Sequence, residues 1–302
     1  MSREENLYRN LKSQIDKIAK HNRQGSFKTK ERYHEAVDRF CKFLAKEYGL
    51  QKFANISDKH LERYVSDMQS RGLAASTIKN DLSAIRFYHD KLDHPRNQLS
   101  DNSRFNLEKR SFGGVNRAWS HDEYQAFRDL CHARGQARIA QIATLARNEG
   151  LRIHETLKLD RSAAEKAIKT GVLHVVGKGG RERDVPLSRE SREMLQERIQ
   201  DVERGQKLFV REGEKTHLVI KQVQNFINRN REHFQDQSRE QARDQGEAII
   251  ERITFHGLRH AYAQKRYQEA IERGLTDRKA RLEVSALLGH ERDDVTRIYT
   301  VN

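Results

Sequence analysis

Four short motifs and one tyrosine carry side chains that can bind anions, move protons or attack as nucleophiles. GLRIHE and TFHGLRH each contain an arginine, and GKGGRER places a lysine among glycines. LLGH ends in a histidine that a tyrosine follows nine residues later. Each side chain alone is more often an ordinary surface, capping or packing residue, so the inference rests on their joint order. In chain order these residues are Arg152, Lys178, His256, Arg259, His260, His290 and Tyr299.

The arginines and the tyrosine fit the chemistry of phosphodiester cleavage. Cleavage builds negative charge on a five-coordinate phosphorus, so such a site needs fixed positive donors. A planar guanidinium can bind two nonbridging oxygens and keeps its proton. A phenol oxygen can attack the phosphorus, but its reference pKa of about 10 demands a proton acceptor or a strongly positive site at neutral pH. Arg152, Arg259 and Tyr299 are therefore candidates for an anion clamp and a nucleophile.

The ordered set resembles the catalytic domain of the tyrosine recombinases, or integrases, across about residues 119–300. LLGHERDDVTRIYT is the most specific part of this match. The N-terminal region is similar to the SAM-like core-binding domain of the same family, with ASTIKNDLSAIRFYHDKL as its best segment. The resemblance implies a mainly α protein with the DNA breaking-rejoining fold. In that fold a helical core-binding domain precedes a mostly helical catalytic domain with a small β-hairpin.

Within this resemblance, each motif has an expected role in cutting and rejoining DNA. Arg152 and Arg259 clamp the scissile phosphate. Tyr299 forms a 3′-phosphotyrosine, which conserves the bond energy for rejoining. His256 is the acid/base partner of the tyrosine, and Lys178 at the tip of the hairpin protonates the leaving 5′-oxygen.

Three further residues complete the implied site. His290 donates a hydrogen bond to the phosphate, Glu155 resembles the family's acidic supporting residue, and His260 supports the site without reacting. No metal or other cofactor is expected, because the sequence has no carboxylate cluster with two-metal spacing and a covalent tyrosine makes a metal-activated water unnecessary. ATP is not expected either, because no P-loop motif occurs.

The resemblance implies a site-specific recombinase that acts on double-stranded DNA recombination sites. Four subunits are expected to exchange strands through a Holliday junction, with accessory DNA-bending proteins as further partners. Only three residues follow Tyr299, so the chain is expected to be truncated or to assemble without the family's usual C-terminal segment. The alternatives are a DNA-binding regulator without catalysis, and a type IB topoisomerase or hairpin telomere resolvase with the same chemistry. An RNA-binding module is less favoured, because no aromatic RNP-like segment occurs.

The charge of the chain favours a polyanionic partner. Its formal net charge is +14 and its pI is about 9.8, and neutralising phosphates releases condensed counterions. Residues 1–117 hold 24 Lys+Arg against 15 Asp+Glu, a net of +9, and residues 118–302 hold 34 against 29, a net of +5. No apolar run approaches the roughly 20 residues of a membrane span, no secretory signal occurs, and the two cysteines lie far apart. A cytoplasmic, nucleoid-associated protein of a bacterium, phage or mobile element is expected.

Apolar side chains that recur every three or four residues predict the helices that would position these motifs. A capping box, in which Ser120 precedes Glu123 by three residues, marks the start of a helix, and Arg152 follows a turn glycine and opens another. Two short β segments flank the glycine-rich turn GKGG at 177–180, and together they predict a hairpin. The predicted helices lie at 33–48 (capped by Ser26 or Thr29), 56–68, 78–87, 136–149, 188–204 and 219–233, and the predicted strands at 173–176 and 183–187.

The stretch 93–117 loses this periodicity and collects Pro, Gly, Asn and Ser. A linker over 96–117 is therefore predicted between a core-binding domain at 1–95 and a catalytic domain at 118–302. The polar stretch 234–251 is predicted to be an exposed helix or a flexible insert. The residues of the N-terminal helices that are expected to contact DNA are Lys28, Thr29, Ser76, Thr77, Lys79, Asn80 and Arg86.

Overall fold

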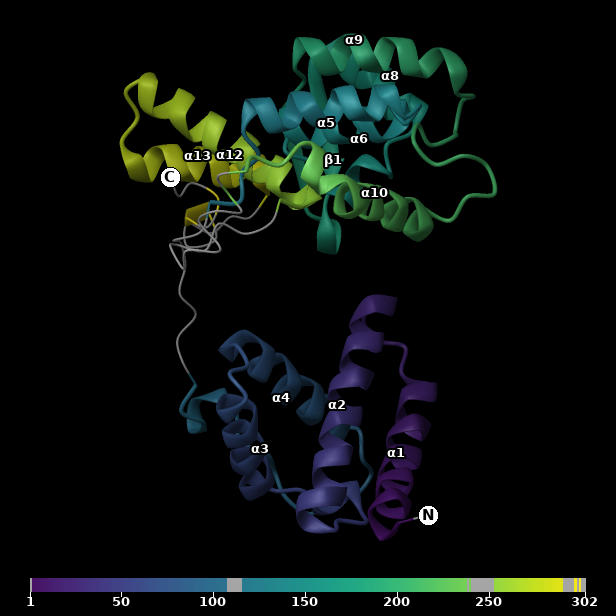
Figure 1. Cartoon of the computed structure of the whole chain (residues 1–302), viewed down its shortest axis with the longest axis vertical. Helices are drawn as coiled ribbons and strands as arrows, with labels where there is room; N and C mark the ends of the chain where they lie inside the picture. Colours follow the sequence, from purple (N-terminus) through teal and green to yellow (C-terminus); the bar gives the residue numbers. More distant parts are fainter. Residues whose placement is uncertain are drawn as a thin grey trace. The chain divides into compact units, whose positions relative to one another are not determined.

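The computed structural model describes residues 2–107, 116–237, 239, 253–289, 296, 297 and 299 (Figure 1). The chain forms two compact units, Met1–Ser111 and Phe112–Asn302. Helices predominate among the described residues, and two short strands pair there as one hairpin. The predicted mainly α fold with a small hairpin is therefore confirmed.

The N-terminal unit is built from helices whose apolar faces meet in one core. Leu11, Phe40, Leu61 and Leu82 come from four different helices and are fully buried in it. The three helices predicted by periodicity are present, and the first helix falls inside the region expected to be helical. The elements are α1 (Arg3–His21), α2 (Phe27–Tyr48), η1 (Phe53–Asn55), α3 (Asp58–Ser70), α4 (Ala75–His89) and η2 (Asn102–Arg104).

The segment after α4 folds back onto the N-terminal unit. Phe105 is buried in its core. Arg86 of α4 donates to the Ser100 carbonyl at 3.0 Å and to Asn102 Oδ1 at 2.6 Å, and Ser100 Oγ donates to Asp58 Oδ2 at 2.6 Å. The first part of the predicted linker is thus held by specific contacts, while residues 108–115 lie outside the described residues.

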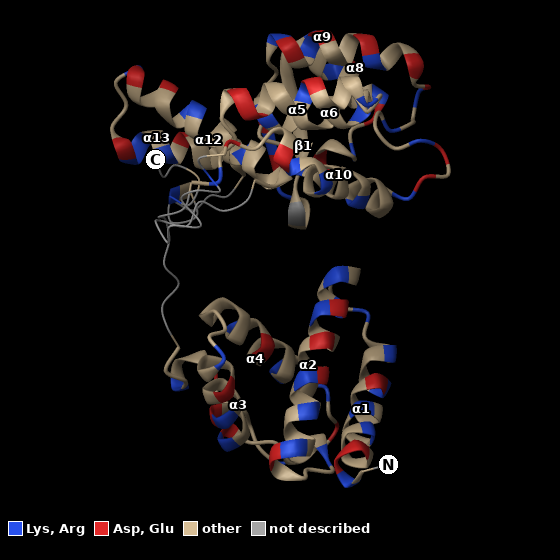
Figure 2. Cartoon of the chain, viewed as in Figure 1, with Lys and Arg blue, Asp and Glu red and all other residues tan. Residues whose placement is uncertain are grey.

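Basic residues are spread over all four helices of the N-terminal unit (Figure 2). Examples are Lys12 on α1, Lys28 on α2, Lys59 on α3 and Lys79 on α4. The positive charge of this unit is therefore distributed over all four helices and is not confined to one of them.

The C-terminal unit is organised around α6, a buried helix that contacts α5, α7, α9 and α12. Ile142, Ala143, Leu145 and Ala146 of α6 are fully buried. Ser120 and Glu123 form the predicted capping box, with hydrogen bonds of 3.1 and 2.8 Å. The helices and turns are α5 (His121–Ala133), α6 (Ala137–Asn148), α7 (Ile153–Thr156), α8 (Arg161–Thr170), η3 (Lys178–Gly180), α9 (Arg189–Arg198), η4 (Ile199–Asp201), α10 (Thr216–Asn230), η5 (Arg231–His233), α12 (Phe255–Glu272) and α13 (Asp277–Leu288).

The predicted hairpin consists of β1 (Val172–Val176) and β2 (Glu182–Pro186), paired antiparallel with Val172 opposite Pro186. Side chains alternate between exposed and buried along both strands. The tip is η3, where Gly179 adopts a φ of 77° that favours glycine. The hairpin prediction is confirmed, with each strand shifted by one residue at most.

Two local predictions differ from the structure. The helix after Arg152 is a single turn, α7, because the Leu159 carbonyl pairs with the Leu208 N–H at 2.9 Å and Asp160 caps α8 instead. The stretch predicted to be exposed after 233 contains Arg239, which is 9% exposed. Its Nε lies 2.6 Å from Glu123 Oε1, so ion pairing with the capping carboxylate offsets the cost of burial. Residues 238 and 240–251 of that stretch lie outside the described residues.

Both cysteines are buried helix residues. Cys41 lies in the core of the N-terminal unit and Cys131 in that of the C-terminal unit. Burial raises the pKa of each thiol to about 12, so neither is a reactive thiolate at neutral pH. Among the described helices, none has the length and apolar character needed to cross a membrane.

Candidate active site

Gly150 sets the path of the chain into Arg152. It follows α6 with a φ of 65°, a conformation that favours glycine. A Cβ at this position would also collide with the ring of Tyr262 on α12. The turn brings Leu151 into the core and presents Arg152 in an extended conformation at the start of α7. A packing constraint and a backbone constraint thus both position this arginine.

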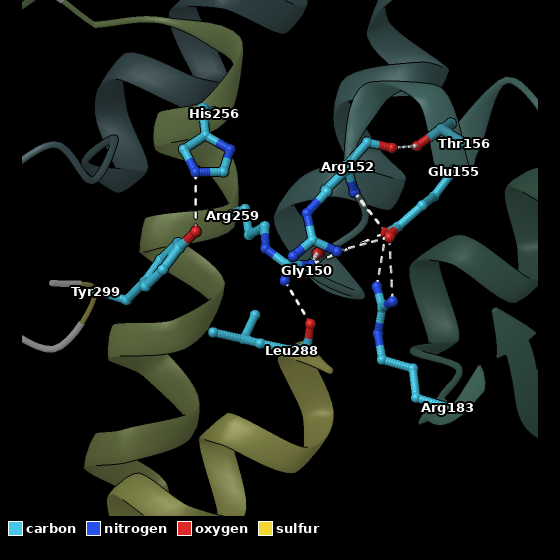
Figure 3. Close-up of polar contacts among 9 residues, drawn as sticks. All are labelled: Gly150, Arg152, Glu155, Thr156, Arg183, His256, Arg259, Leu288 and Tyr299. Atoms are coloured by element: carbon cyan, nitrogen blue, oxygen red, sulfur yellow. Dashed lines mark hydrogen bonds and ion pairs between the residues drawn. The ribbon is translucent and has the colours of Figure 1, made fainter. Parts of the chain in front are cut away.

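The carboxylate of Glu155 lies between Arg152 and Arg183 (Figure 3). Arg152 Nη1 donates to Oε1 at 2.8 Å and the Arg152 backbone N–H donates to Oε2 at 2.9 Å. Arg183 forms a bidentate contact, with distances of 3.2 Å to Oε1 and 2.7 Å to Oε2. Arg259 Nη1 is 4.0 Å from Oε2. One buried carboxylate therefore organises three guanidinium groups.

The ionisation of Glu155 depends on these arginines. Burial by itself raises the pKa of this carboxyl, but hydrogen bonding and charge from Arg183, the backbone of Arg152 and the charge of Arg259 lower it to about 2. Glu155 is therefore charged at neutral pH. It partly offsets the repulsion between the arginines and leaves the cluster with a net positive charge, as an anion site requires.

Arg259 is 1% exposed and is held by backbone carbonyls from two other segments. Its Nη1 donates to the Gly150 carbonyl, and its Nη2 donates to the Leu288 carbonyl at 2.5 Å. Burial and the nearby positive charge of Arg152 lower its pKa to about 10, so the guanidinium stays charged at neutral pH. These contacts tie α12 to the end of α6 and to the end of α13 around a fixed positive charge (Figure 3).

His256 and Tyr299 meet beside this charge. His256 Nε2 lies 3.0 Å from the Tyr299 hydroxyl, although the two residues are 43 positions apart. Tyr299 is 7% exposed, stacks on His260 at 4.2 Å between ring centroids, and lies 5.9 Å from Arg259 Cζ. The ring is thus held between two histidines and an arginine. Figure 3 shows its hydroxyl directed at an imidazole nitrogen of His256.

His256 is a neutral imidazole at physiological pH. Burial, followed by the positive charges of Arg259, Arg152 and Arg117, lowers its pKa to about 4. A neutral imidazole has one ring nitrogen that can accept a proton. With the ring proton on Nδ1, Nε2 can accept from the Tyr299 hydroxyl. The arrangement can therefore deprotonate a phenol next to a cluster of cations.

The structure brings together six of the eight residues predicted for catalysis or support: Arg152, Glu155, His256, Arg259, His260 and Tyr299. For Lys178, the backbone lies in η3 at the hairpin tip, but its side chain is outside the description. His290 lies outside the described residues, directly after Gly289. Among the described residues, no group of three or more His, Cys, Asp or Glu side chains has a metal-binding arrangement.

The residues predicted to contact DNA lie in two places on the N-terminal unit. Lys28 and Thr29 are in the first turn of α2, where the Thr29 N–H is capped by Ser26 at 3.2 Å. The remaining five lie along α4, and the guanidinium of Arg86 is engaged by the segment that follows α4.

Arg183 is a site residue that is not among those predicted from the motifs. A usable signal is present in the sequence, because residues of a strand alternate between two faces and Arg183 shares a face with the buried Val185. A charge at an inward strand position needs a buried partner. The partner itself, Glu155, is 28 residues away and no local pattern identifies it.

Comparison with known proteins extends over most of the chain. Residues 118–302 match the model of the phage integrase family, and residues 8–91 match the model of the phage integrase N-terminal region. A tyrosine recombinase XerC of Pediococcus pentosaceus is 28% identical over 286 residues, covering 92% of this chain and 88% of the relative. A tyrosine recombinase XerD of Bradyrhizobium diazoefficiens is 25% identical over 296 residues, covering 90% and 85%.

Solved structures with a similar fold include two recombinases captured on DNA. A lambda integrase dimer bound to a COC′ core site has a TM-score of 0.63 and 17% identity, covering 96% of this chain and 95% of that chain. The XerH site-specific recombinase, in a post-cleavage complex with a palindromic difH substrate, has a TM-score of 0.61 and 22% identity, covering 96% and 81%. A lambda integrase tetramer bound to a Holliday junction has a TM-score of 0.61 and 17% identity, covering 95% and 76%.

Proposed function

Because this chain belongs to the phage integrase family and is a tyrosine-type site-specific recombinase that cleaves and rejoins DNA, we propose that the Tyr299 hydroxyl attacks the scissile phosphate. The observation that carries the assignment is the 3.0 Å contact between this hydroxyl and His256 Nε2, beside the charge of Arg259. The oxygen of Tyr299 bonds to phosphorus, and the bond from phosphorus to the 5′-oxygen breaks. A 3′-phosphotyrosine conserves the ester bond for rejoining.

His256 is the proposed proton acceptor in this step. The phenol must lose its proton as it attacks, and a neutral imidazole within hydrogen-bond distance can take it. The lowered pKa of His256 keeps the imidazole neutral before DNA binds. In the reverse step, in which a 5′-hydroxyl attacks the phosphotyrosine, the same nitrogen returns the proton to the phenol oxygen.

Arg152 and Arg259 are the proposed clamp for the phosphate oxygens. The side chain of Arg152 is 24% exposed and anchored on Glu155, so a DNA phosphate can approach it while its orientation stays fixed. Arg259 supplies a buried positive charge whose position is set by two carbonyls. Positive groups oriented in advance stabilise the charge of the transition state without reorganising during the reaction.

Lys178 and His290 are proposed to complete the reaction. Lys178 belongs to a glycine-rich hairpin tip, from which an ammonium group could protonate the leaving 5′-oxygen. His290 follows Leu288 and Gly289 in the sequence, and the Leu288 carbonyl accepts a hydrogen bond from Arg259. His290 is proposed to donate a hydrogen bond to the phosphate. Glu155 and His260 are proposed to hold the arginines and the tyrosine ring in place.

The proposed substrate is double-stranded DNA that carries recombination sites, bound by both units. The N-terminal unit would contact DNA through the start of α2 and through α4, with the phosphates paired to side chains that include Lys28 and Lys79. A contact by Arg86 would require exchange of its present bonds to the segment after α4. A tetramer that exchanges strands through a Holliday junction is proposed by analogy with the lambda integrase tetramer, with accessory DNA-bending proteins as additional partners.

A suicide-substrate experiment tests the proposed function. The wild-type protein would be incubated with nicked duplexes made from the DNA that flanks its gene, and the products separated on a denaturing gel. A covalent protein–DNA adduct whose linked peptide contains Tyr299 is expected. DNA binding without any adduct, across all flanking duplexes, would instead favour a regulator without catalysis.

The rate of adduct formation should be nearly independent of pH between about 6 and 8. His256 has a pKa lowered to about 4 and Glu155 a pKa lowered to about 2, so both keep their working forms throughout this range. Single-turnover rates measured at protein concentrations below saturation report the pKa values of the free enzyme. A fall in rate with a midpoint near the ordinary histidine pKa of about 6.5 would contradict the assignment of His256 as a buried neutral base.

DNA binding should weaken steeply with salt. Each phosphate contact that releases a counterion lowers log K by about 0.9 per tenfold increase in salt, so six to ten contacts would lower affinity by about 10³–10⁵ between roughly 50 and 200 mM. Fluorescence anisotropy measures this slope. Lys28→Gln should reduce the slope by about one, whereas Lys46→Gln, near the other end of α2, should leave it unchanged. A slope near zero for the wild type would contradict phosphate recognition.

A further inference from the structure

Arg183 lies where three parts of the proposed active site converge. Its guanidinium holds both oxygens of Glu155, at 3.2 and 2.7 Å. Through Glu155 it is linked to Arg152, whose Nη1 and backbone N–H bind the same carboxylate. The side chain of Arg183 is 5% exposed and that of Glu155 is 0% exposed, so the pair is shielded from solvent and from salt.

The same side chain lies close to the backbone of two segments that directly precede proposed site residues. A Cβ placed on Gly177, the residue before Lys178, would lie 3.3 Å from Glu155 Oε1 and 3.6 Å from Arg183 Nη1. A Cβ placed on Gly289, the residue before His290, would lie 3.1 Å from Arg183 Cδ. A side chain at either position would therefore press against the Arg183–Glu155 pair and shift it by a few tenths of an ångström, and at Gly289 the φ of 65° favours glycine as well.

From these contacts we propose that Arg183 is a positioning residue that sets the hairpin and the end of α13 in register with the arginine clamp. It acts through Glu155 on Arg152 and does not itself touch the DNA phosphate. The inference rests on the proposed function, because it concerns the geometry of that site. In chemical terms, the positive charge of Arg183 keeps the fully buried carboxylate of Glu155 ionised, and the ionised carboxylate keeps Arg152 oriented.

Removal of the guanidinium should make cleavage sensitive to pH in a range where the wild type is not. In Arg183→Met, burial of Glu155 is opposed by less positive charge, so the pKa of Glu155 rises. We expect adduct formation to be about 10–100-fold slower at pH 8 and to slow further as the pH falls to 6, because protonated Glu155 binds Arg152 weakly. The affinity for DNA should change by less than about threefold, since the side chain is buried.

Two further variants separate a positioning role from loss of structure. Adding Glu155→Gln to Arg183→Met should abolish the additional pH dependence, because the titrating group is gone. Arg183→Lys keeps the charge but loses the bidentate geometry, so it should form adduct faster than Arg183→Met and slower than the wild type. Arg189→Met removes an arginine that is 91% exposed in the next helix and should match the wild type.

Unfolding in urea gives a readout that needs no DNA. In the wild type the lowered pKa of Glu155 contributes stability above its unfolded-state pKa, and this contribution is lost as the pH falls towards 2. In Arg183→Met the native-state pKa rises towards the unfolded-state value, so the variant is less stable at neutral pH and loses less stability on acidification than the wild type, and Glu155→Gln removes this difference in pH dependence. If Arg183→Met does not fold, Arg183→Gln, which also removes the charge but keeps a hydrogen-bond donor, provides the same comparison.

The outcomes for the two proposals are distinct. If the wild type forms no adduct, the proposed function fails whatever the unfolding data show. If the wild type forms adduct and Arg183→Met does so at the same rate, or with the same flat pH profile, the positioning role of Arg183 is overturned. A slower Arg183→Met whose deficit is equal at pH 6 and pH 8 would also overturn it, because that result indicates only a structural defect.

Discussion

Tyr299→Phe should bind the suicide duplex with the affinity of the wild type and form no detectable covalent adduct. The substitution removes only the hydroxyl that lies 3.0 Å from His256 Nε2. The ring can still stack on His260 at a centroid distance of 4.2 Å, so the packing around the site is preserved. No other oxygen is proposed to form the phosphodiester link, and the loss of a nucleophile is therefore complete rather than partial. A denaturing gel and an anisotropy titration on the same DNA measure the two quantities.

Tyr267→Phe is the matched control for this result. Its hydroxyl donates to Asp277 at 2.6 Å, and its ring is partly buried in the same unit. We expect it to form adduct at the wild-type rate. A covalent complex that persists in Tyr299→Phe at a rate within about tenfold of the wild type would identify another nucleophile and refute the proposed mechanism.

Arg152→Ala should slow adduct formation by about 10²–10³-fold, which corresponds to about 2.7–4 kcal/mol of transition-state stabilisation. The loss should fall on the rate, because the charge that this guanidinium balances develops only as the phosphorus becomes five-coordinate. The affinity for DNA should change far less, since many other cations contribute to binding. Single-turnover rates at saturating protein, compared with binding isotherms, separate the two effects.

Arg152 is a better test than Arg259, because we expect its removal to disturb the fold less. Glu155 would keep its bidentate contact with Arg183, whereas removal of Arg259 would leave the buried carbonyls of Gly150 and Leu288 without these donors. A buried acceptor left without a donor lowers the free energy of unfolding by about 1–3 kcal/mol. A slower rate in an Arg259 variant could therefore come from unfolding and not from loss of the clamp. Arg189→Ala, on the exposed face of α9, controls for loss of one positive charge. Equal losses in rate and affinity for Arg152→Ala would indicate an anchoring role only.

Local sequence signals predicted much of the secondary structure correctly. The caps at Ser26 and Ser120 and the glycine-rich hairpin tip depend on residues within a few positions of one another, and each is present. Periodicity was reliable where a helix packs on one face, as in α2. It failed after Arg152, where a backbone pair between Leu159 and the distant Leu208 ends the helix after one turn.

The identity and order of the reactive side chains were determined by the sequence alone. The sequence shows which groups can hold a phosphate and which can attack it. These groups are an arginine after a turn glycine, a further arginine with histidines, and a final tyrosine. These properties belong to the side chains and need no knowledge of contacts. The basic charge, which favours a DNA partner, is likewise a property of composition.

Only the tertiary structure decided how these groups behave. Burial and nearby arginines together lower the pKa of His256 and keep it neutral. At Glu155 the arginines outweigh burial and keep the carboxylate ionised. Folding brings these arginines together from distant parts of the chain. The part played by Arg183 appears only when its strand is packed against α7. The physical reason is that desolvation and charge–charge interaction depend on distance in space. Folding brings Glu155 and Arg183, which are 28 positions apart, and His256 and Tyr299, which are 43 positions apart, within hydrogen-bond distance.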